Sequence, residues 1–444
     1  MNFLGNYINE SKERASGITE GDLSVYGVDR TAGLTPNAKY QSKDTSNYKV
    51  IRPGMFAYNP MRLNIGSIAF CTSKNGIGLV SPDYVVFRCK KSVLDPVFLS
   101  HVINGPAWQH WTTGAGVGSV RIRIYYKELA TMPFDPPPYP EQKAIAHILG
   151  SLDDKIELNR RINETLEGMA QTLFKSWFVD FDPVIDNALA AGNPIPEELA
   201  KRAQVRSQAL ANGTANREAA KNFPDAFQLT EEMGWIPEGW EAKPLGEVAS
   251  ILNGYAFKSG DYIDSGIFVL RTKNFDANGL SSRRTDDVFL PESFAESHDT
   301  YLSQPFDFHL VMVGASIGKT SLLLPHMLPA LRNQNMWCFR PTSDFLSRTF
   351  LNLAVQKKVE EVMMWASGSA RSFFRKSDFK NHEILIPSDE LLLAFENIAG
   401  PMFLGVSNKS AESETLSKLR DTLLPKLISG ELRIEDAEKL VKAI

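Results

Sequence analysis

The chain has 444 residues, of which 43% are hydrophobic and 23% charged, and its formal net charge is −4. This is the composition of a soluble globular protein with two or three domains, and it gives no global sign of nucleic-acid binding. Three cysteines without C-x-x-C spacing and seven histidines without an H-x-x-x-H pair argue against disulfides and a metal centre. We expect a cytoplasmic protein without a secretory leader or membrane span.

Residues 1–139 form the first predicted globular domain. Short apolar runs rich in β-branched and aromatic residues, such as YVVFRC from Tyr84, alternate with segments rich in Gly, Asn and Ser. This pattern is typical of strands joined by loops. Four loop side chains are of types that pair with base edges in the major groove of DNA. They are Arg62, Asn64, Lys74 and Asn75.

A basic stretch, GSVRIRIYY from Gly118, lies near the end of this domain. Arg121 and Arg123 follow a Gly-Ser pair and are interleaved with aromatic residues, which suits contacts with DNA phosphates. The alternative is a solvated strand edge whose positive charge prevents aggregation. Because the second half of the chain has arginine at the position matching Arg121, the phosphate role is favoured.

Residues 140–182 are predicted to form a long helix. Pro140 stands where a first helical turn tolerates proline, and apolar residues then recur at three- and four-residue steps, as in a coiled-coil seam. The 38 residues from Glu141 to Phe178 would give a rod of roughly 57 Å. A polar seam residue such as Asn159 fixes pairing rather than adding stability. The predicted seam is Ile145, Leu149, Leu152, Ile156, Asn159, Leu166, Leu173 and Trp177.

After a connector, the chain repeats itself. Residues 183–239 are rich in Ala, Asn, Gln and Glu, and they predict a short exposed helix without chemistry of its own. In the second globular domain, residues 240–388, the segment GSARSFFRK aligns with GSVRIRIYY at an offset of 250. Further upstream, Ile317-Gly318 falls on Ile65-Gly66 at an offset of 252. The chain is therefore predicted to hold two copies of one unit.

The second domain carries its own candidate DNA contacts. Arg371, Arg375 and Lys376 continue its Gly-Ser motif and repeat the phosphate-binding pattern. The loop residues of base-pairing types differ between the two copies, as expected of related domains that bind different half-sites. They are Lys258, Arg271, Lys273, Asn274, Arg283, Arg284, Arg332, Asn333 and Gln334.

The stretch GASIGKT, residues 314–320, resembles a nucleotide-binding loop but is not expected to be one. Such a loop has four residues between its glycines, whereas three separate Gly314 from Gly318. The first copy reads NIGSI, so Lys319 falls on Ser67 and only Ile-Gly is shared. This predicts a strand–turn–strand framework, and it leaves Lys319 as a DNA contact particular to the second domain.

Residues 389–444 are predicted to form a second spacer helix and a C-terminal tail. Its seam includes Leu416, Leu419 and Leu423, but Gly400-Pro401 should kink or interrupt the helix. Two long helices would most simply pack antiparallel as a coiled-coil spacer between two similar mixed α/β domains. The predicted fold is thus α+β with a pseudo-two-fold repeat. The alternative is that each helix folds back on its own domain.

Motifs along almost the whole chain resemble the specificity subunits of type I restriction-modification systems. They are SPDYVVF (81–87), PPYPEQKAIAHILGSLDDKIELN (137–159), LFKSWFVDFDP (173–183), IPEGW (236–240), LNGYAFKSGDY (252–262) and LRDTLLPKLISGEL (419–432). The central helix motif is highly specific for this family. The second helix departs from it, with Leu391-Leu392 where the first has Glu141-Gln142.

The resemblance implies two target recognition domains, each of which binds one half of a split sequence in double-stranded DNA. It implies that the two helical regions form the spacer and dock methyltransferase subunits, and the repeat predicts two of these. Restriction subunits are further expected partners. S-adenosylmethionine would be bound by the methyltransferase, and this chain would be a non-catalytic subunit without a cofactor of its own.

The competing class is an enzyme, either a nucleotide hydrolase or a methyltransferase. The sequence speaks against both, because it has no complete phosphate-binding loop, no glycine-rich S-adenosylmethionine loop and no N-P-P-[YF] tetrapeptide. A third class is a scaffold that binds only protein, which a DNA-binding measurement would distinguish.

Overall fold

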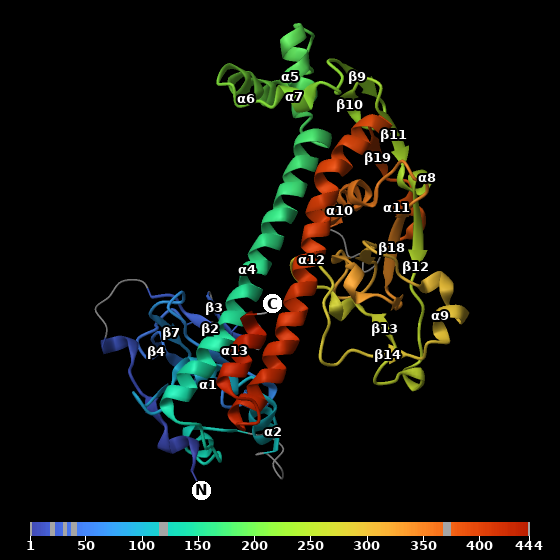
Figure 1. The fold of residues 1–444 in the computed structure, drawn as a ribbon. Helices are drawn as coiled ribbons and strands as arrows, with labels where there is room; N and C mark the ends of the chain where they lie inside the picture. The colour runs from blue at the N-terminus through green and yellow to red at the C-terminus, as the bar shows by residue number, and fades with distance from the viewer. Residues whose placement is uncertain are drawn as a thin grey trace. The chain divides into compact units, whose positions relative to one another are not determined.

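The computed structural model describes residues 2–17, 23–29, 33–36, 42–114, 123–366 and 374–442. The chain divides into two compact units: unit 1 is Met1–Leu158 with Glu412–Ile444, and unit 2 is Asn159–Ala411. The helices α4 (Tyr139–Phe178) and α12 (Asp389–Ile428) contribute to both units (Figure 1). Within the described ranges, no helix is long and apolar enough to cross a membrane.

Unit 1 is built on a four-stranded antiparallel sheet in the order β1-β8-β5-β6. Because side chains alternate along a strand, Phe56 and Phe87 face a core shared with the helices, whereas Ala57 and Val86 face the β2–β3 hairpin. The elements are β1 (Ile8–Ser11), β2 (Tyr26–Asp29), β3 (Gly33–Pro36), β4 (Lys49–Ile51), β5 (Met55–Tyr58), β6 (Ile68–Phe70), β7 (Gly78–Val80), β8 (Val85–Cys89), α1 (Pro96–Val102), α2 (Pro106–Gly114), α3 (Tyr126–Leu129) and α13 (Ile434–Lys442).

Unit 2 is built on a four-stranded antiparallel sheet in the order β12-β18-β15-β16. A three-stranded sheet, β14-β13-β17, lies beside it, and α10 lies between β18 and α12 (Figure 1). The elements are α8 (Leu245–Val248), β11 (Glu241–Pro244), β12 (Ala249–Asn253), β13 (Ile267–Leu270), β14 (Phe289–Leu290), α9 (Phe294–Ser297), β15 (Phe308–Val311), β16 (Thr320–Leu322), β17 (Ala330–Arg332), β18 (Met336–Pro341), α10 (Arg348–Ala366), α11 (Lys376–Lys380) and β19 (Glu383–Ile386).

The two four-stranded sheets share strand order and register. In unit 1, Phe56 is paired with Phe87 on one side. In unit 2, Phe308 is paired with Phe339, so both positions are displaced by the same 252 residues. The next strand keeps this displacement, because Phe56 also pairs with Phe70 and Phe308 with Leu322. The offset found in the sequence is therefore the offset of the backbone pairing.

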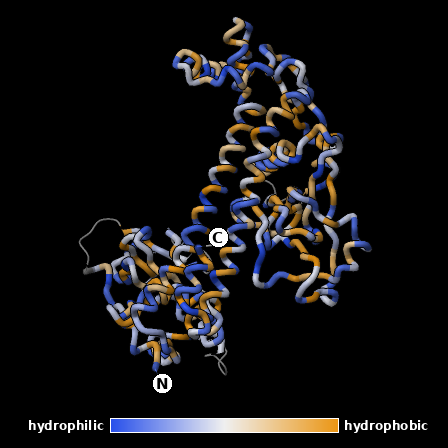
Figure 2. Tube along the Cα trace, viewed as in Figure 1, coloured by the Kyte–Doolittle hydropathy of each residue, from blue (hydrophilic) through white to orange (hydrophobic). Residues whose placement is uncertain are grey.

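Within unit 2, the segments of α4 and α12 pack antiparallel. Asn163 Nδ2 donates to Ser410 Oγ at 2.9 Å, and further along α4 the Trp177 ring lies 6.0 Å from that of Phe395. As numbering rises along α4, it falls along α12. Apolar residues recur along both helices among polar ones (Figure 2).

The predicted seam residues all lie at least partly inside. In unit 1, Leu149 and Leu152 of α4 share a core with Leu416 and Leu423 of α12. Ile145, Asn159 and Trp177 are buried, and Ile156, Leu166, Leu173 and Leu419 are partly buried. The helix α12 continues through Gly400 and Pro401, so the expected interruption is wrong. Pro401 is exposed, and buried Phe395, Ala399 and Val406 hold the helix on both sides of it.

The connector is folded. It comprises α5 (Asp182–Ala191), α6 (Ala200–Ala211), α7 (Arg217–Ala220), β9 (Phe227–Thr230) and β10 (Gly234–Pro237). Buried Asp182 accepts two hydrogen bonds of 2.6 Å from Arg202, and buried Asp186 is paired with Arg206 in the same way. These bidentate pairs clamp α6 onto α5.

Candidate nucleic-acid interface

In unit 2, several predicted DNA contacts meet where β12 and β17 end. The Tyr255 amide donates to Arg332 O at 3.0 Å, and the Gln334 amide donates back to Tyr255 O at 2.9 Å. A Cβ on Gly254 would lie 1.8 Å from Asn333 O, so this close approach requires glycine. Gln334 and Lys258 are exposed on this edge.

The basic residues after the second Gly-Ser motif lie beside the same edge. Lys376, in the first turn of α11, has Nζ 3.4 Å from Asn253 Oδ1. Burial and, to a lesser degree, the nearby positive charge of Lys380 lower the pKa of Lys376. Arg375 is exposed next to it. We call the surface formed by Asn253, Tyr255, Lys258, Asn333, Gln334, Arg375 and Lys376 the recognition edge.

In unit 1, the exposed side chains of Arg62 and Arg123 lie on neighbouring segments. The Ile124 amide donates to Pro60 O at 3.0 Å, which ties the segment after Arg123 to the turn that holds Arg62 and half-buried Asn64. In unit 2 the matching bond runs from Phe374 N to Met312 O at 2.8 Å. Both domains thus attach this segment in the same way.

Two predicted contacts are wrong, because their side chains are buried. Arg332 is 0% exposed and donates to Leu302 O at 2.7 Å and to Thr300 O at 2.6 Å. Asn274 is also 0% exposed and donates to Ser282 O and to Asp287. A fully enclosed side chain that is hydrogen-bonded within the protein cannot pair with a base edge.

Five further candidates in unit 2 make internal contacts. Arg271 and Lys273 both donate to Asp286 O, and Arg284 is paired with Asp276. The Arg283 guanidinium lies 3.7 Å from the Phe268 ring centre, and Lys319 donates to Phe275 O. The chain therefore uses Arg271, Lys273, Arg283, Arg284 and Lys319 to fasten its own loops.

Of the remaining candidate DNA contacts, two lie on one turn of unit 1 and two lie outside the residues that the structure describes. Asn75 Oδ1 accepts from Thr72 N at 2.9 Å and from Thr72 Oγ1 at 2.8 Å, while Lys74 is exposed on the same turn. Arg121 and Arg371 lie outside the described residues, so their phosphate role stays a prediction.

The stretch GASIGKT is a strand–turn–strand element, as predicted. It joins β15 to its antiparallel neighbour β16 rather than opening a helix. Gly318 has φ +83°, and Gly66 at the matching position has φ +86°. Both glycines serve the left-handed turn, and residues 314–320 do not have the strand–loop–helix geometry of a phosphate-binding loop.

One group of side chains in the described residues has metal-binding types: Asp307, His309 and Cys338, all buried. Arg340 donates to the Asp307 carboxylate at 2.9 and 2.6 Å, and Arg348 also pairs with it. Burial lowers the pKa of His309 to about 3, and burial raises the pKa of the Cys338 thiol. Because arginines already neutralise the carboxylate and the thiol stays protonated, this group does not suit a cation.

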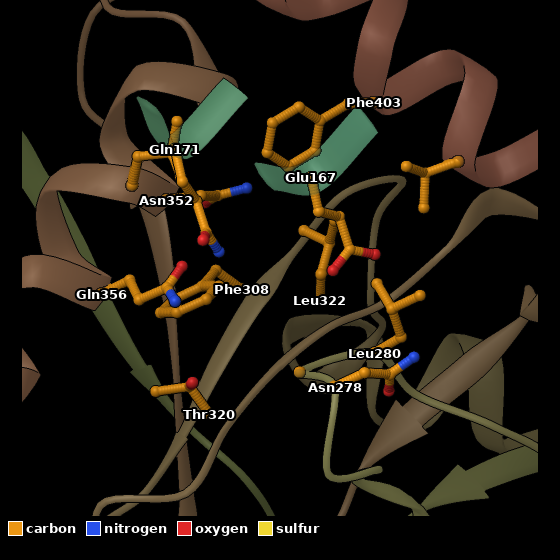
Figure 3. A pocket seen from close by; sticks show the side chains of 13 residues that line it. Glu167, Gln171, Asn278, Leu280, Phe308, Thr320, Leu322, Asn352, Gln356 and Phe403 are labelled. Atoms are coloured by element: carbon orange, nitrogen blue, oxygen red, sulfur yellow. The ribbon is translucent and has the colours of Figure 1, made fainter. Parts of the chain in front are cut away.

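A small pocket in unit 2 lies among α4, α10, α12 and the β15–β16 hairpin (Figure 3). Its volume is about 50 Å³, far below the roughly 300 Å³ at which small-molecule sites begin. Burial and the neighbouring Glu164 raise the pKa of Glu167 to about 7. Among the described residues, Glu167 Oε1 and Asn352 Oδ1 have no hydrogen-bond partner. The pocket suits a few waters and is too small for S-adenosylmethionine.

Sequence reasoning missed the aromatic side chains of the recognition edge. Tyr255 lies within the motif LNGYAFKSGDY, yet its partners His298 and Tyr301 come from a distant segment. In the sequence, only the motif itself, with Lys258 close by, could have indicated that Tyr255 is a functional residue.

Sequence reasoning also missed the structural role of Gln142. Its buried side-chain amide accepts from Asp95 N and donates to Val93 O and Pro137 O.

Comparisons with known proteins agree with this architecture. The family model of the type I restriction modification DNA specificity domain matches residues 61–168 and 237–391, more than half of the chain. The type I restriction enzyme HindI specificity subunit of Haemophilus influenzae is 26% identical over 412 residues, covering 86% of this chain and 88% of that protein. The MjaIX specificity subunit of Methanocaldococcus jannaschii is 26% identical over 302 residues, covering 67% and 61%.

A solved structure has a similar fold. The type I restriction-modification S subunit from M. genitalium superposes with a TM-score of 0.50 at 14% identity, covering 96% of this chain and 95% of that one. This likeness concerns the fold alone. The two segments matched by the family model, which together cover more than half of the chain, show that it belongs to the family of type I restriction-modification DNA specificity subunits.

Proposed function

We propose that this chain is the non-catalytic subunit that selects the DNA target of a type I restriction-modification complex. Its two target recognition domains, residues 1–139 and 240–388, would each bind one half of a split sequence. The observation that carries this proposal is the pair of four-stranded sheets with one strand order and one register. Two copies of one framework with different loops suit two different half-sites.

The helices α4 and α12 are proposed to form the coiled-coil spacer between these domains. Support comes from their antiparallel packing inside unit 2 and from the burial of the seam residues in both units. A spacer of fixed length would fix the separation of the half-sites. The same repeat would offer equivalent surfaces to two methyltransferase subunits, which would bind S-adenosylmethionine and methylate adenine, and restriction subunits would complete the complex.

Phosphate contacts are assigned to Arg62, Arg123, Arg375 and Lys376, together with Arg121 and Arg371, and base contacts to Asn64, Lys74, Lys258, Asn333 and Gln334. All the described members of this set are exposed or half-buried, as a DNA contact must be. Charge neutralisation at the phosphates makes binding depend steeply on salt concentration.

Methylome sequencing tests this function. A strain that carries the gene should show adenine methylation at one split motif, and deletion of the gene should abolish it. Exchange of residues 240–388 for those of another family member should change only one half of the motif. A change of both halves would contradict independent domains, and a purified complex that binds no duplex would contradict the DNA-binding role.

A further inference from the structure

The recognition edge of unit 2 carries a cluster of aromatic side chains. The Tyr255 ring lies 5.0 Å from Phe257, 4.8 Å from His298 and 5.0 Å from Tyr301. Behind them, the Phe294 ring stacks on His298 at 5.0 Å with an interplanar angle of 13°. Tyr255 is 39% exposed, so part of its ring faces outward while the cluster supports the rest.

The backbone holds Tyr255 in a fixed position. Hydrogen bonds join Tyr255 N to Arg332 O and Gln334 N to Tyr255 O, at 3.0 and 2.9 Å. The close approach at Gly254 brings the two chain segments together. The backbones of Tyr255 and Gln334 are therefore held next to each other by main-chain hydrogen bonds.

The buried Arg332 fastens the aromatic loop to these two segments. Its guanidinium donates to Thr300 O and Leu302 O, which flank Tyr301. Its own carbonyl accepts the Tyr255 amide. One side chain thus links the loop that carries His298 and Tyr301 to the segment that carries Tyr255. In unit 1 the matching position at the 252-residue offset is Val80, which has no such donors.

The two polar residues next to Tyr255, Asn333 and Gln334, differ in whether their side chains are available to hydrogen-bond with a base. Asn333 Oδ1 accepts the Gln334 amide at 2.7 Å, so the oxygen of that side chain is occupied. The exposed Gln334 side chain makes no hydrogen bond to another described residue. A glutamine amide pairs with adenine N6 and N7, and an apolar surface contacts the thymine 5-methyl group. Adenine N6 and N7 and the thymine 5-methyl group all lie on the major-groove edge of one A·T pair.

We propose that Tyr255 and Gln334 recognise one A·T pair in the half-site of unit 2, with the Tyr255 ring against the thymine 5-methyl group and the Gln334 amide on adenine. Arg332 is a positioning residue for this pair of contacts. The proposal rests on the proposed DNA-binding function and names the base pair that this edge selects.

Single-atom changes in the DNA test the two contacts. The assembled complex with its methyltransferase is titrated with duplexes in which each thymine of the half-site is replaced in turn by deoxyuridine. One replacement should weaken wild-type binding about fourfold, the effect of one buried methyl group. Tyr255→Ala should weaken binding to the unmodified duplex and lose no further affinity with deoxyuridine. Phe345→Ala, an exposed aromatic control at 71% exposure, should behave as wild type.

The adenine contact has a parallel test that does not disturb the core. Replacement of the paired adenine by 7-deazaadenine removes the N7 acceptor and should weaken wild-type binding about tenfold, but not that of Gln334→Ala. The proposal is overturned if Tyr255→Ala and Gln334→Ala remain as sensitive to the modified bases as wild type, or if no thymine in this half-site is sensitive. A wild-type complex that binds no duplex at all would instead overturn the proposed function.

The positioning role of Arg332 has its own signature. Arg332→Met keeps the bulk of the side chain but removes the donors to Thr300 and Leu302. Amides of residues 298–302 should exchange hydrogen faster, and discrimination between thymine and deoxyuridine should vanish while the salt dependence of binding is unchanged. A reduced salt slope with retained discrimination would show a phosphate contact and overturn the positioning role.

Discussion

The two four-stranded sheets have the same framework but differ on one face. In unit 1, that face carries Met55, Ala57, Ala69 and Val86, all buried in an apolar cluster under β2–β3. At the same offset of 252, unit 2 has Asp307, His309, Ser321 and Cys338, all buried. The opposite face stays apolar in both units, where it packs with the helices.

This difference shows that a shared backbone arrangement does not determine whether the second face of the sheet is apolar or polar. Strand order and register depend on main-chain hydrogen bonds and on the apolar face, which both units keep. The other face can be apolar or polar, provided that every buried charge has partners. In unit 2, Asp307 meets Arg340 and Arg348, and Ser281 is hydrogen-bonded to Ser321 at 2.7 Å. Arg332 Nη1 lies 3.9 Å from Asp307, so the polar layer adjoins the residue whose carbonyl accepts the Tyr255 amide.

The largest effect is expected at Asp307. Asp307→Asn removes the carboxylate that compensates Arg340 and Arg348, so unit 2 should lose about 3–5 kcal/mol of unfolding free energy. Met55→Leu, at the matching position of unit 1, conserves volume and should cost less than about 1.5 kcal/mol. Denaturant unfolding of both variants checks this. Equal losses would show that the two faces are energetically alike.

The second largest effect is a pH dependence of the stability of unit 2, which we expect from Glu167. At the offset of 250, the matching position in unit 1 is Ser417, which does not titrate. With a pKa raised from its usual value to about 7, Glu167 binds a proton in the folded state that the unfolded chain releases. Stability from this group is therefore present below about pH 4.5 and is lost as pH rises towards 7. Because solvent reaches the pocket, the loss should be on the order of 2 kcal/mol.

Glu167→Gln should remove this pH dependence and stabilise unit 2 at pH 8. Glu164→Gln, which leaves the burial of Glu167 unchanged, should reduce the slope only slightly. Thermal unfolding of the three proteins between pH 4.5 and 8 measures it. A Glu167→Gln profile parallel to that of wild type would contradict the assignment.

The shared turn should respond alike in both units. Gly66→Ala places a Cβ on a residue with φ +86° and should cost about 1 kcal/mol. Gly318→Ala has the same backbone cost and a further steric cost, because a Cβ there would lie 2.6 Å from Met363 Sδ, which must move. Shifts of the urea midpoint measure both costs. If one variant were neutral, the equivalence of the turns would not hold.

The smallest expected effect comes from a comparison of the exposed Arg62 with Lys273, which is paired within its own unit. Arg62→Ala should weaken DNA binding about fivefold for all sequences and reduce the salt slope by about 1. Lys273 is half-buried and already paired with Asp286, so its replacement by alanine should leave affinity unchanged. Electrophoretic shift at several salt concentrations distinguishes them. A loss of sequence preference in Arg62→Ala at unchanged affinity would contradict a phosphate contact.

For the predicted site residues, the type of side chain did not distinguish a DNA contact from an internal hydrogen bond, whereas the position in the fold did. Arg332, Asn274 and Lys319 have the side chains of DNA contacts, yet they bond to carbonyls of their own domain. An arginine that pairs with guanine and one that clamps a loop are the same residue, because both need only an acceptor within reach. Local sequence does not say which acceptor the fold will bring near.

The sequence by itself determined the 252-residue offset that the two sheets share, the strand–turn–strand at Gly318, and the two long helices with their buried apolar residues. These follow from spacing, which local geometry converts directly into faces and turns. Tertiary structure alone decided which face of each sheet is polar, that α12 continues through Pro401, and which cations face outward. It also brought Tyr255 beside His298 and Tyr301, because contacts between distant segments depend on packing and leave no periodic mark in the chain.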